Sequence, residues 1–236
     1  MTFNQIILVT DGESNFGISP VEVAKNAYEK GIKVNTIGIV RNDDKEMPLV
    51  EVQEIAKSGG GICQITNLSN LSNALSMVTV QSIHCTIEEL VNKELKQIID
   101  KDIKEIPPQS RGKIVDMMDR LEDEISIKCL LLLDTSASMK NKIKASKASV
   151  LELLRFLKER KGSSEVGVII YPGEDNLYHI VSDFTSNIGD LESCMELISV
   201  GGITPTGPAL RGGIEMFFGE EISTREEDGF LKDYIV

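Results

Sequence analysis

The sequence contains no apolar run long enough to cross a membrane. Its longest run, Cys129 to Leu133, falls far short of the ~20 residues that a membrane-spanning helix needs. The first residues, MTFNQIILVTDG, carry no basic segment ahead of their short apolar run, so no signal peptide is expected. These two absences together predict a soluble, cytoplasmic protein.

Cysteine and histidine are also scarce, and they do not cluster. No CxxC pair occurs among the cysteines, and the two histidines, His84 and His179, lie far apart. Because structural zinc sites need clustered cysteine and histidine ligands, a zinc site is not expected. Because Cys63 and Cys129 fall in apolar strand-like runs, we interpret the cysteines as small buried hydrophobic residues in a reducing compartment. They are Cys63, Cys85, Cys129 and Cys194.

Basic residues are fewer than acidic ones. Lys and Arg number 25 against 37 Asp and Glu, which gives a formal net charge of −12. Such a chain repels the phosphates of nucleic acids and anionic membrane surfaces, so neither is expected as a partner. The 236 residues are 41% hydrophobic, which is enough to build the core of one large domain or two small ones.

The stretch richest in candidate functional side chains is CLLLLDTSASMK, residues 129–140. An apolar run that ends in Asp134, Ser136 and Ser138 predicts a buried parallel strand, a tight turn and then a helix. Asp134 would lie at the carboxyl end of that strand, where open α/β sheets bind ligands. Carboxylate and hydroxyl oxygens on alternate residues suit a hard cation such as Mg²⁺ or Mn²⁺. The alternative is that Ser136 or Ser138 only caps the next helix.

The rest of the chain alternates between short apolar runs and amphipathic segments. Strands are expected at residues 5–9, 32–40, 62–65, 165–171 and 177–181, and helices at 20–30, 48–57, 67–78, 142–160, 188–199 and 208–218. The PGEDN turn predicts that the last two strands form a hairpin, with an antiparallel edge strand. The predicted fold class is α/β: a Rossmann-like, doubly wound, mostly parallel six-stranded sheet with helices on both faces.

Residues 79–124 break this pattern. Two polar helical stretches, Ile87 to Ile99 and Arg111 to Leu121, flank Ile106-Pro107-Pro108, which predicts a helical hairpin or connector rather than sheet. Each stretch carries apolar residues at helical spacing, so we expect the connector to pack on the sheet domain instead of folding alone.

The DxSxS pattern resembles the first segment of the metal-ion-dependent adhesion site in the von Willebrand factor type A family. The two other segments of that site have counterparts here, Thr204 in TPTG and Asp11 in VTDG, although the aspartate segment comes first in this chain and last in the family. The resemblance implies that Asp134, Ser136, Ser138, Thr204 and Asp11 hold Mg²⁺ or Mn²⁺. It also implies that the hydroxyls are direct ligands and that the carboxylates act directly or through water.

The rotated order of the three segments has a simple interpretation. Residues 125–219 resemble the first half of one type A domain and residues 5–78 the second half, with each element present once. We therefore expect residues 1–236 to form a single circularly permuted domain, in which 79–124 is the connector and 220–236 an acidic tail. Independent half-domains would each expose an apolar sheet edge. A monomer is expected, with a domain-swapped dimer as the alternative.

The resemblance implies a metal-ion-dependent protein-binding module, not an enzyme, whose cation accepts an acidic residue of a partner protein. One alternative is a Mg²⁺-dependent phosphatase or phosphotransferase, which would need a nucleophile or general base beside the metal. No histidine falls in the three site segments, and neither GxGxxG nor GxxxxGK[ST] occurs. The other alternative is a metal-independent scaffold that has kept the fold.

Overall fold

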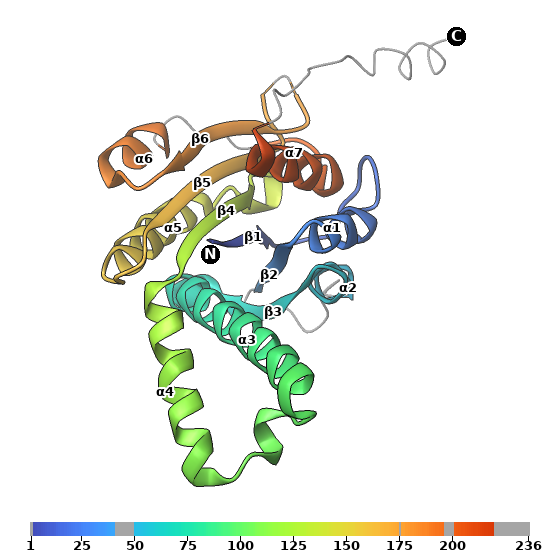
Figure 1. Ribbon diagram of the computed structural model, residues 1–236. Helices are drawn as coiled ribbons and strands as arrows, with labels where there is room; N and C mark the ends of the chain where they lie inside the picture. Colours follow the sequence, from blue (N-terminus) through green and yellow to red (C-terminus); the bar gives the residue numbers. More distant parts are fainter. Residues whose placement is uncertain (1, 41–49, 175, 196–200, 220–236) are drawn as a thin grey trace.

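The computed structural model describes residues 2–40, 50–174, 176–195 and 201–219 (Figure 1). The strands are β1 (Thr2–Thr10), β2 (Ile32–Val40), β3 (Gly60–Asn67), β4 (Ser126–Asp134), β5 (Ser164–Tyr171) and β6 (His179–Thr185). The helices are α1 (Pro20–Glu29), α2 (Val50–Ser58), α3 (Leu71–Ile99), α4 (Pro108–Glu124), α5 (Ile143–Lys158), α6 (Ile188–Met195) and α7 (Thr206–Phe218). The expected loop at 41–46, the end of the helix expected at 188–199 and the tail at 220–236 lie outside the described residues.

The strands form one six-stranded sheet in the order β3-β2-β1-β4-β5-β6. Neighbouring strands are parallel except β5 and β6, which pair antiparallel at the edge. The predicted Rossmann-like α/β fold is therefore confirmed. From the central pair, β1 and β4, the chain continues toward opposite edges of the sheet, through β2 and β3 on one side and β5 and β6 on the other.

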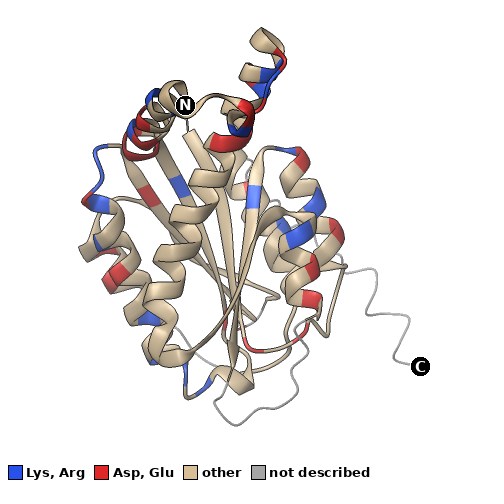
Figure 2. Ribbon diagram, turned by 90° about the horizontal axis from the view of Figure 1, so that it is seen from below, with Lys and Arg blue, Asp and Glu red and all other residues tan. Residues whose placement is uncertain are grey.

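Alternate side chains of the central strands enter two separate cores. In β1, Ile6 and Leu8 join the core under α1, α2 and α7, whereas Ile7 and Val9 join the core under α3, α5 and α6. Figure 2 shows the sheet between these two helix layers, with most charged residues on the helices. Because both faces of β4 are covered, the strand needs the near-continuous apolar run that its sequence carries.

The first helix begins and ends where its sequence predicts. The hydroxyl of Ser19 accepts a hydrogen bond from the backbone N–H of Glu22, and Pro20 occupies the first turn, where a missing N–H costs nothing. Gly31 follows the helix with a φ of +79°, a conformation that favours glycine.

Three glycines, 59–61, lie between the helix expected at 48–57 and the strand expected at 62–65, and Gly60 and Gly61 belong to β3. A Cβ atom on Gly61 would lie 2.2 Å from the carbonyl oxygen of Val34 in β2. β2 and β3 approach so closely there that a side chain at position 61 is excluded, so Gly61 allows the two strands to pair.

The expected break near residue 79 does not occur, because α3 is one continuous helix from Leu71 to Ile99. Its polar residues are accommodated within the helix: the hydroxyl of Thr79 bonds the carbonyl of Leu75 at 2.8 Å, and that of Thr86 bonds the carbonyl of Ser82 at 2.8 Å.

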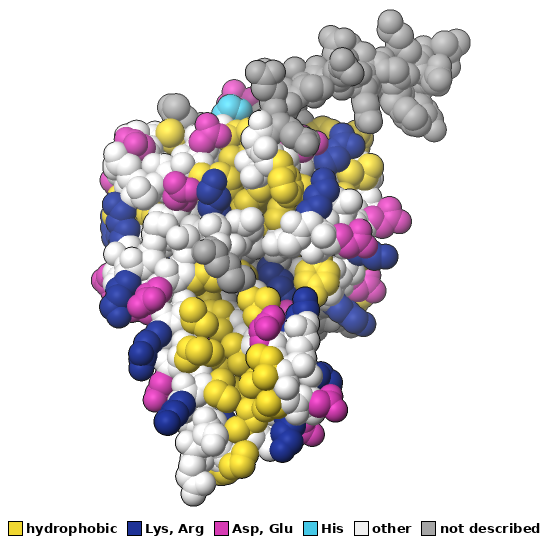
Figure 3. Space-filling model, in the orientation of Figure 1, with side chains coloured by type: hydrophobic (Ala, Val, Ile, Leu, Met, Phe, Trp, Pro, Cys, Tyr) yellow, Lys and Arg dark blue, Asp and Glu magenta, His cyan; other side chains and the backbone are white. Residues whose placement is uncertain are grey.

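The second half of α3 and α4 form a hairpin arm that projects from the sheet (Figure 1). Ile87 and Met118 at its base are buried in the main core, as expected of a docked connector. Farther out, Ile98 and Val115 are exposed, and Figure 3 shows hydrophobic side chains gathered along this part of the molecule. No helix within the described ranges is both long and apolar enough to cross a membrane.

Candidate metal centre

The ends of β1 and β4 place Thr10 beside Asp134. Val9 pairs with Leu133, so the next residue of each strand lies at the carboxyl edge of the sheet, on the same face. The hydroxyl of Thr10 donates a hydrogen bond to Asp134 Oδ2 at 2.6 Å. The hydroxyl of Thr10 thus positions the central carboxylate.

Both strands end in the same kind of turn. Asp134 Oδ1 accepts a hydrogen bond from the backbone N–H of Ser136 at 2.8 Å, and Thr10 Oγ1 accepts one from the N–H of Gly12 at 3.2 Å. A short polar side chain that bonds the backbone two residues later turns the chain sharply away from its strand. The oxygen-bearing residues that follow each strand therefore gather at one edge of the sheet.

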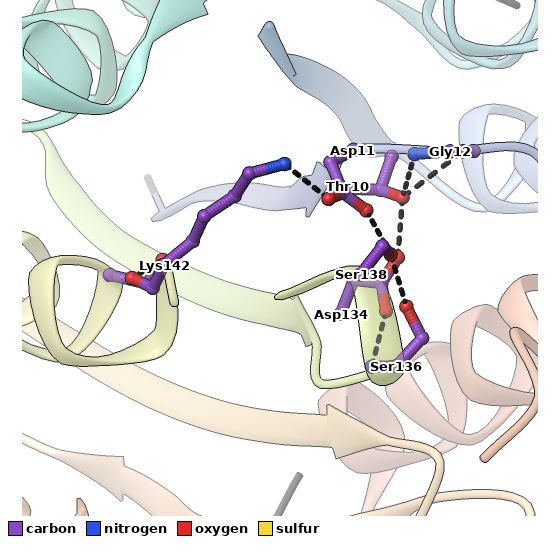
Figure 4. Close-up of polar contacts among 8 residues, drawn as sticks. Thr10, Asp11, Gly12, Asp134, Ser136, Ser138 and Lys142 are labelled. Atoms are coloured by element: carbon purple, nitrogen blue, oxygen red, sulfur yellow. Dashed lines mark hydrogen bonds and ion pairs between the residues drawn. The ribbon is translucent and has the colours of Figure 1, made fainter. Parts of the chain in front are cut away.

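Ser136, Ser138 and Asp11 continue this cluster of oxygens (Figure 4). Ser136 Oγ and Ser138 Oγ lie 3.1 Å apart, and Ser138 Oγ donates to Asp11 Oδ1 at 2.6 Å. Asp134 and Ser136 are buried, whereas Ser138 is exposed. The cluster thus has a buried floor and a rim that solvent or a partner can reach.

Thr204 is held by its backbone against the loop that follows β1. Its N–H donates to Asn15 Oδ1 at 2.8 Å, and its carbonyl accepts from the N–H of Asn15 at 3.1 Å and from Ser14 Oγ at 3.2 Å. The N–H of Gly201 donates to the carbonyl of Thr135 at 2.9 Å. The Thr204 loop is thereby tied to the loops that follow β1 and β4. The hydroxyl of Thr204 takes part in none of these contacts.

A lysine that the sequence did not single out completes the cluster. The ammonium of Lys142 pairs with Asp11 Oδ2 (Figure 4). The two side chains are 9% and 3% exposed. From its sequence context Lys142 is only the first polar residue of a helix. Its contact with Asp11 depends on the fold, because 131 positions separate the two residues.

Within the described residues, Asp11 pairs with the ammonium of Lys142, whereas the Asp134 carboxylate is held by hydrogen bonds alone. Burial raises the pKa of Asp134; the hydrogen bonds from Thr10 and Ser136 offset part of that shift, and the charge of Asp11 adds to it. The site would therefore gain from a further positive charge.

Tyr171 pairs with Asp134 in the neighbouring strand, and its buried hydroxyl has no hydrogen-bond partner within the described part of the chain. Burial and the charge of Asp134 raise its pKa well above the usual value. The hydroxyls of Thr206 and Thr10 lie close enough to offset part of this shift but not in hydrogen-bond geometry. An unpaired buried hydroxyl beside the cluster fits a site that takes a further polar group.

The donor set fits a hard cation. Neighbouring oxygens around a six-coordinate Mg²⁺ at ~2.1 Å lie about 3 Å apart, which is close to the 3.1 Å between Ser136 Oγ and Ser138 Oγ. In the part of the chain that the structure covers, no three His, Cys, Asp or Glu side chains form a metal-binding group. The cluster itself combines the carboxylates of Asp11 and Asp134 with the hydroxyls of Ser136 and Ser138, and such an all-oxygen donor set suits Mg²⁺ or Mn²⁺ better than zinc.

Comparison with known proteins agrees with this fold. Family models for the von Willebrand factor type A domain match residues 4–79 and 129–228, which include the five predicted site residues. The chain is 39% identical over 233 residues to the uncharacterized protein YabS of Bacillus subtilis (strain 168), covering 98% of this chain and 94% of that protein. A crystal structure of an uncharacterized protein from Alicyclobacillus acidocaldarius subsp. acidocaldarius DSM 446 is 37% identical, with a TM-score of 0.85, and the match covers 92% of this chain and 94% of that one. The chain thus belongs to the von Willebrand factor type A domain family.

Proposed function

We propose that this protein is a metal-ion-dependent protein-binding module. Type A domains are in general protein-interaction modules; the metal dependence and the acidic partner are our proposal. The observation that carries it is the meeting of Asp11, Asp134, Ser136 and Ser138 at one edge of the sheet, although they come from segments more than a hundred residues apart.

The proposal gives each residue a role. Ser136, Ser138 and Thr204 would supply hydroxyl oxygens, while Asp134 and Asp11 would act through their carboxylates, directly or through water. When bound, Mg²⁺ or Mn²⁺ supplies an open coordination position for a carboxylate of the partner. Thr10 and the backbone of Ser136 hold the Asp134 carboxylate in a fixed orientation before any ion arrives.

The surroundings of the site fit a protein partner. Phe16, Ile18 and Ile203 are 48%, 42% and 41% exposed, and they lie on the two loops that the Asn15 and Thr204 hydrogen bonds join. Exposed apolar side chains around a polar centre favour protein binding. Because the net charge of −12 repels acidic partners at long range, recognition would depend on the bound cation and these loops.

We also infer that the chain is one circularly permuted domain. The pairing of β1 with β4 supports this view, because each strand comes from a different family-matched region and the two form the centre of one sheet. A monomer is expected. A domain-swapped dimer would show twice the monomer mass in light scattering.

The two alternatives have unequal support. A phosphatase or phosphotransferase is not favoured by the histidines, because His84 contacts Glu122 on the arm at 2.5 Å and His179 begins the edge strand β6. A metal-independent scaffold is the stronger rival, since Lys142 already neutralises Asp11 without an ion.

Calorimetric titration of the full chain with Mg²⁺ and Mn²⁺ tests the proposal. Binding is expected for the wild type and should be lost in Asp134→Asn, whose amide oxygen can still accept the Ser136 hydrogen bond. Asp183→Asn, which removes an exposed carboxylate from β6, is the matched control and should bind normally. If millimolar metal gives neither heat nor a shift in melting temperature, the scaffold alternative is preferred.

A partner assay then tests the second half of the proposal. A glutamate-containing peptide should bind the Mg²⁺-loaded protein, and both a chelator and replacement of the glutamate by glutamine should abolish that binding. Peptide binding that is unchanged by the chelator would contradict metal-dependent recognition.

A further inference from the structure

Lys142 occupies a position where a cation is not expected. It is the N-cap residue of α5, where Ser, Thr, Asp or Asn is preferred because each can bond the free N–H groups of the first turn. The positive end of the helix dipole also disfavours a cation there. Lys142 makes no side-chain cap hydrogen bond; its ammonium pairs with Asp11 instead.

The backbone of Lys142 is well anchored. Its N–H donates to the carbonyl of Met139 at 2.7 Å, and its own carbonyl accepts from the N–H of Ser146 at 3.0 Å and from Ser146 Oγ at 3.2 Å. Only the side chain can then move without disturbing the start of α5. With 9% of that side chain exposed, Lys142 depends on Asp11 for the partner that a buried lysine requires.

Both oxygens of the Asp11 carboxylate are engaged. Oδ2 pairs with Lys142, and Oδ1 accepts from Ser138. A metal ion at this site would need the same carboxylate, and its charge would repel the ammonium. The ammonium can contact a partner's carboxylate only through N–H hydrogen bonds, whereas a metal ion would coordinate it directly.

We propose that Lys142 is an internal cation that competes with the metal ion for Asp11, so that metal binding requires the ammonium to leave. This inference rests on the proposed function and concerns the regulation of the same site. While Lys142 holds Asp11, the site cannot take the ion. The apparent metal affinity is therefore reduced by the fraction of molecules in which the lysine has swung away.

Lys142→Met tests this competition because methionine keeps an unbranched apolar stem and removes the ammonium. We expect Mg²⁺ to bind this variant about ten-fold more tightly than the wild type, as when a competing state populated in about nine molecules of ten is removed. Without metal, the melting temperature should fall, because Asp11 loses its buried partner. Opposite changes in metal-free stability and metal affinity are the signature of competition.

Lys140→Met is the matched control. Lys140 lies on the same segment but is exposed, so its replacement removes the same charge without touching Asp11 and should leave both quantities unchanged. If Lys142→Met does not fold, Lys142→Gln offers a second neutral variant, whose amide can still donate to Asp11 and preserve the metal-free fold. The double variant Asp11→Asn/Lys142→Met should regain metal-free stability and lose the tight Mg²⁺ binding.

The outcomes are distinguishable by calorimetry and thermal unfolding. Equal or weaker Mg²⁺ binding by Lys142→Met than by the wild type overturns the competition. An equal gain in Mg²⁺ affinity for Lys140→Met overturns it too. The gain would then come from removing any nearby positive charge, not from releasing Asp11. If neither the wild type nor Lys142→Met binds Mg²⁺ or Mn²⁺, the proposed function fails together with the inference.

Discussion

The hydroxyl of Thr10 and the carboxylate of Asp134 form a buried 2.6 Å hydrogen bond across 124 positions of sequence. The single hydroxyl hydrogen can serve one acceptor, and the carbonyl of Gly12 is farther away at 3.1 Å. Thr10 therefore donates to Asp134. The bond joins the two central strands at the edge of the sheet where the candidate metal centre lies.

Thr10→Val keeps the shape of the side chain and removes the donor. We expect the free energy of unfolding to fall by about 1.5–3 kcal/mol, because a buried carboxylate loses a hydrogen bond. Urea unfolding followed by circular dichroism measures the change. Thr10→Ser, which retains the hydroxyl, should stay closer to the wild type. Equal stability of the valine variant and the wild type would show that the bond contributes nothing.

Asp11→Asn and Asp134→Asn should each weaken Mg²⁺ binding. If both carboxylates serve one ion, the double variant loses much less than the sum of the single losses, as is usual for residues coupled through one site. Calorimetric titration of the four proteins gives the coupling. Additive losses would mean that the two residues act independently, which contradicts a shared site.

Two glycine-to-alanine substitutions should have opposite effects. A Cβ atom on Gly207 would lie 2.0 Å from the carbonyl oxygen of Ile18, so Gly207→Ala is expected to cost about 1–3 kcal/mol of stability. Gly112 in α4 has open space around it, so Gly112→Ala should gain about 0.5–1 kcal/mol through helix propensity. Thermal and urea unfolding compare the pair. A stable Gly207→Ala variant would show that the loop shifts at little cost.

Arg160 should contribute to the attachment of the arm. Its guanidinium donates to the carbonyl of Glu122 in α4 and, at 3.2 Å, to that of Ile125. We expect Arg160→Met to lower the free energy of unfolding by about 1–3 kcal/mol, because these carbonyls lose a charged donor. Lys161→Met removes only an exposed ion pair with Asp123 and should have no measurable effect. Equal effects of the two substitutions would contradict this role of Arg160.

Most of the local structure follows from short-range patterns in the sequence. The apolar run before Asp134 predicted a strand covered on both faces, and Ser19-Pro20 predicted the start of α1, because such patterns depend on a few neighbouring residues. That Asp11 and Asp134 would share one sheet edge was also predicted, since parallel strands of an open sheet place their carboxyl ends together, whereas Thr204 was assigned to the site through the resemblance to the type A family. Their use as a metal site stays a prediction.

The side-chain contacts within the site depend on how distant segments pack together. The bond from Thr10 to Asp134 depends on the register of β1 against β4, and the pairing of Lys142 with Asp11 depends on where α5 begins relative to the end of β1. Similarly, α3 continues past residue 79 because burial against the sheet and bonds to its own backbone accommodate polar residues there. The physical reason is that burial and register are set by distant segments, whereas a sequence pattern reports only on its own neighbours.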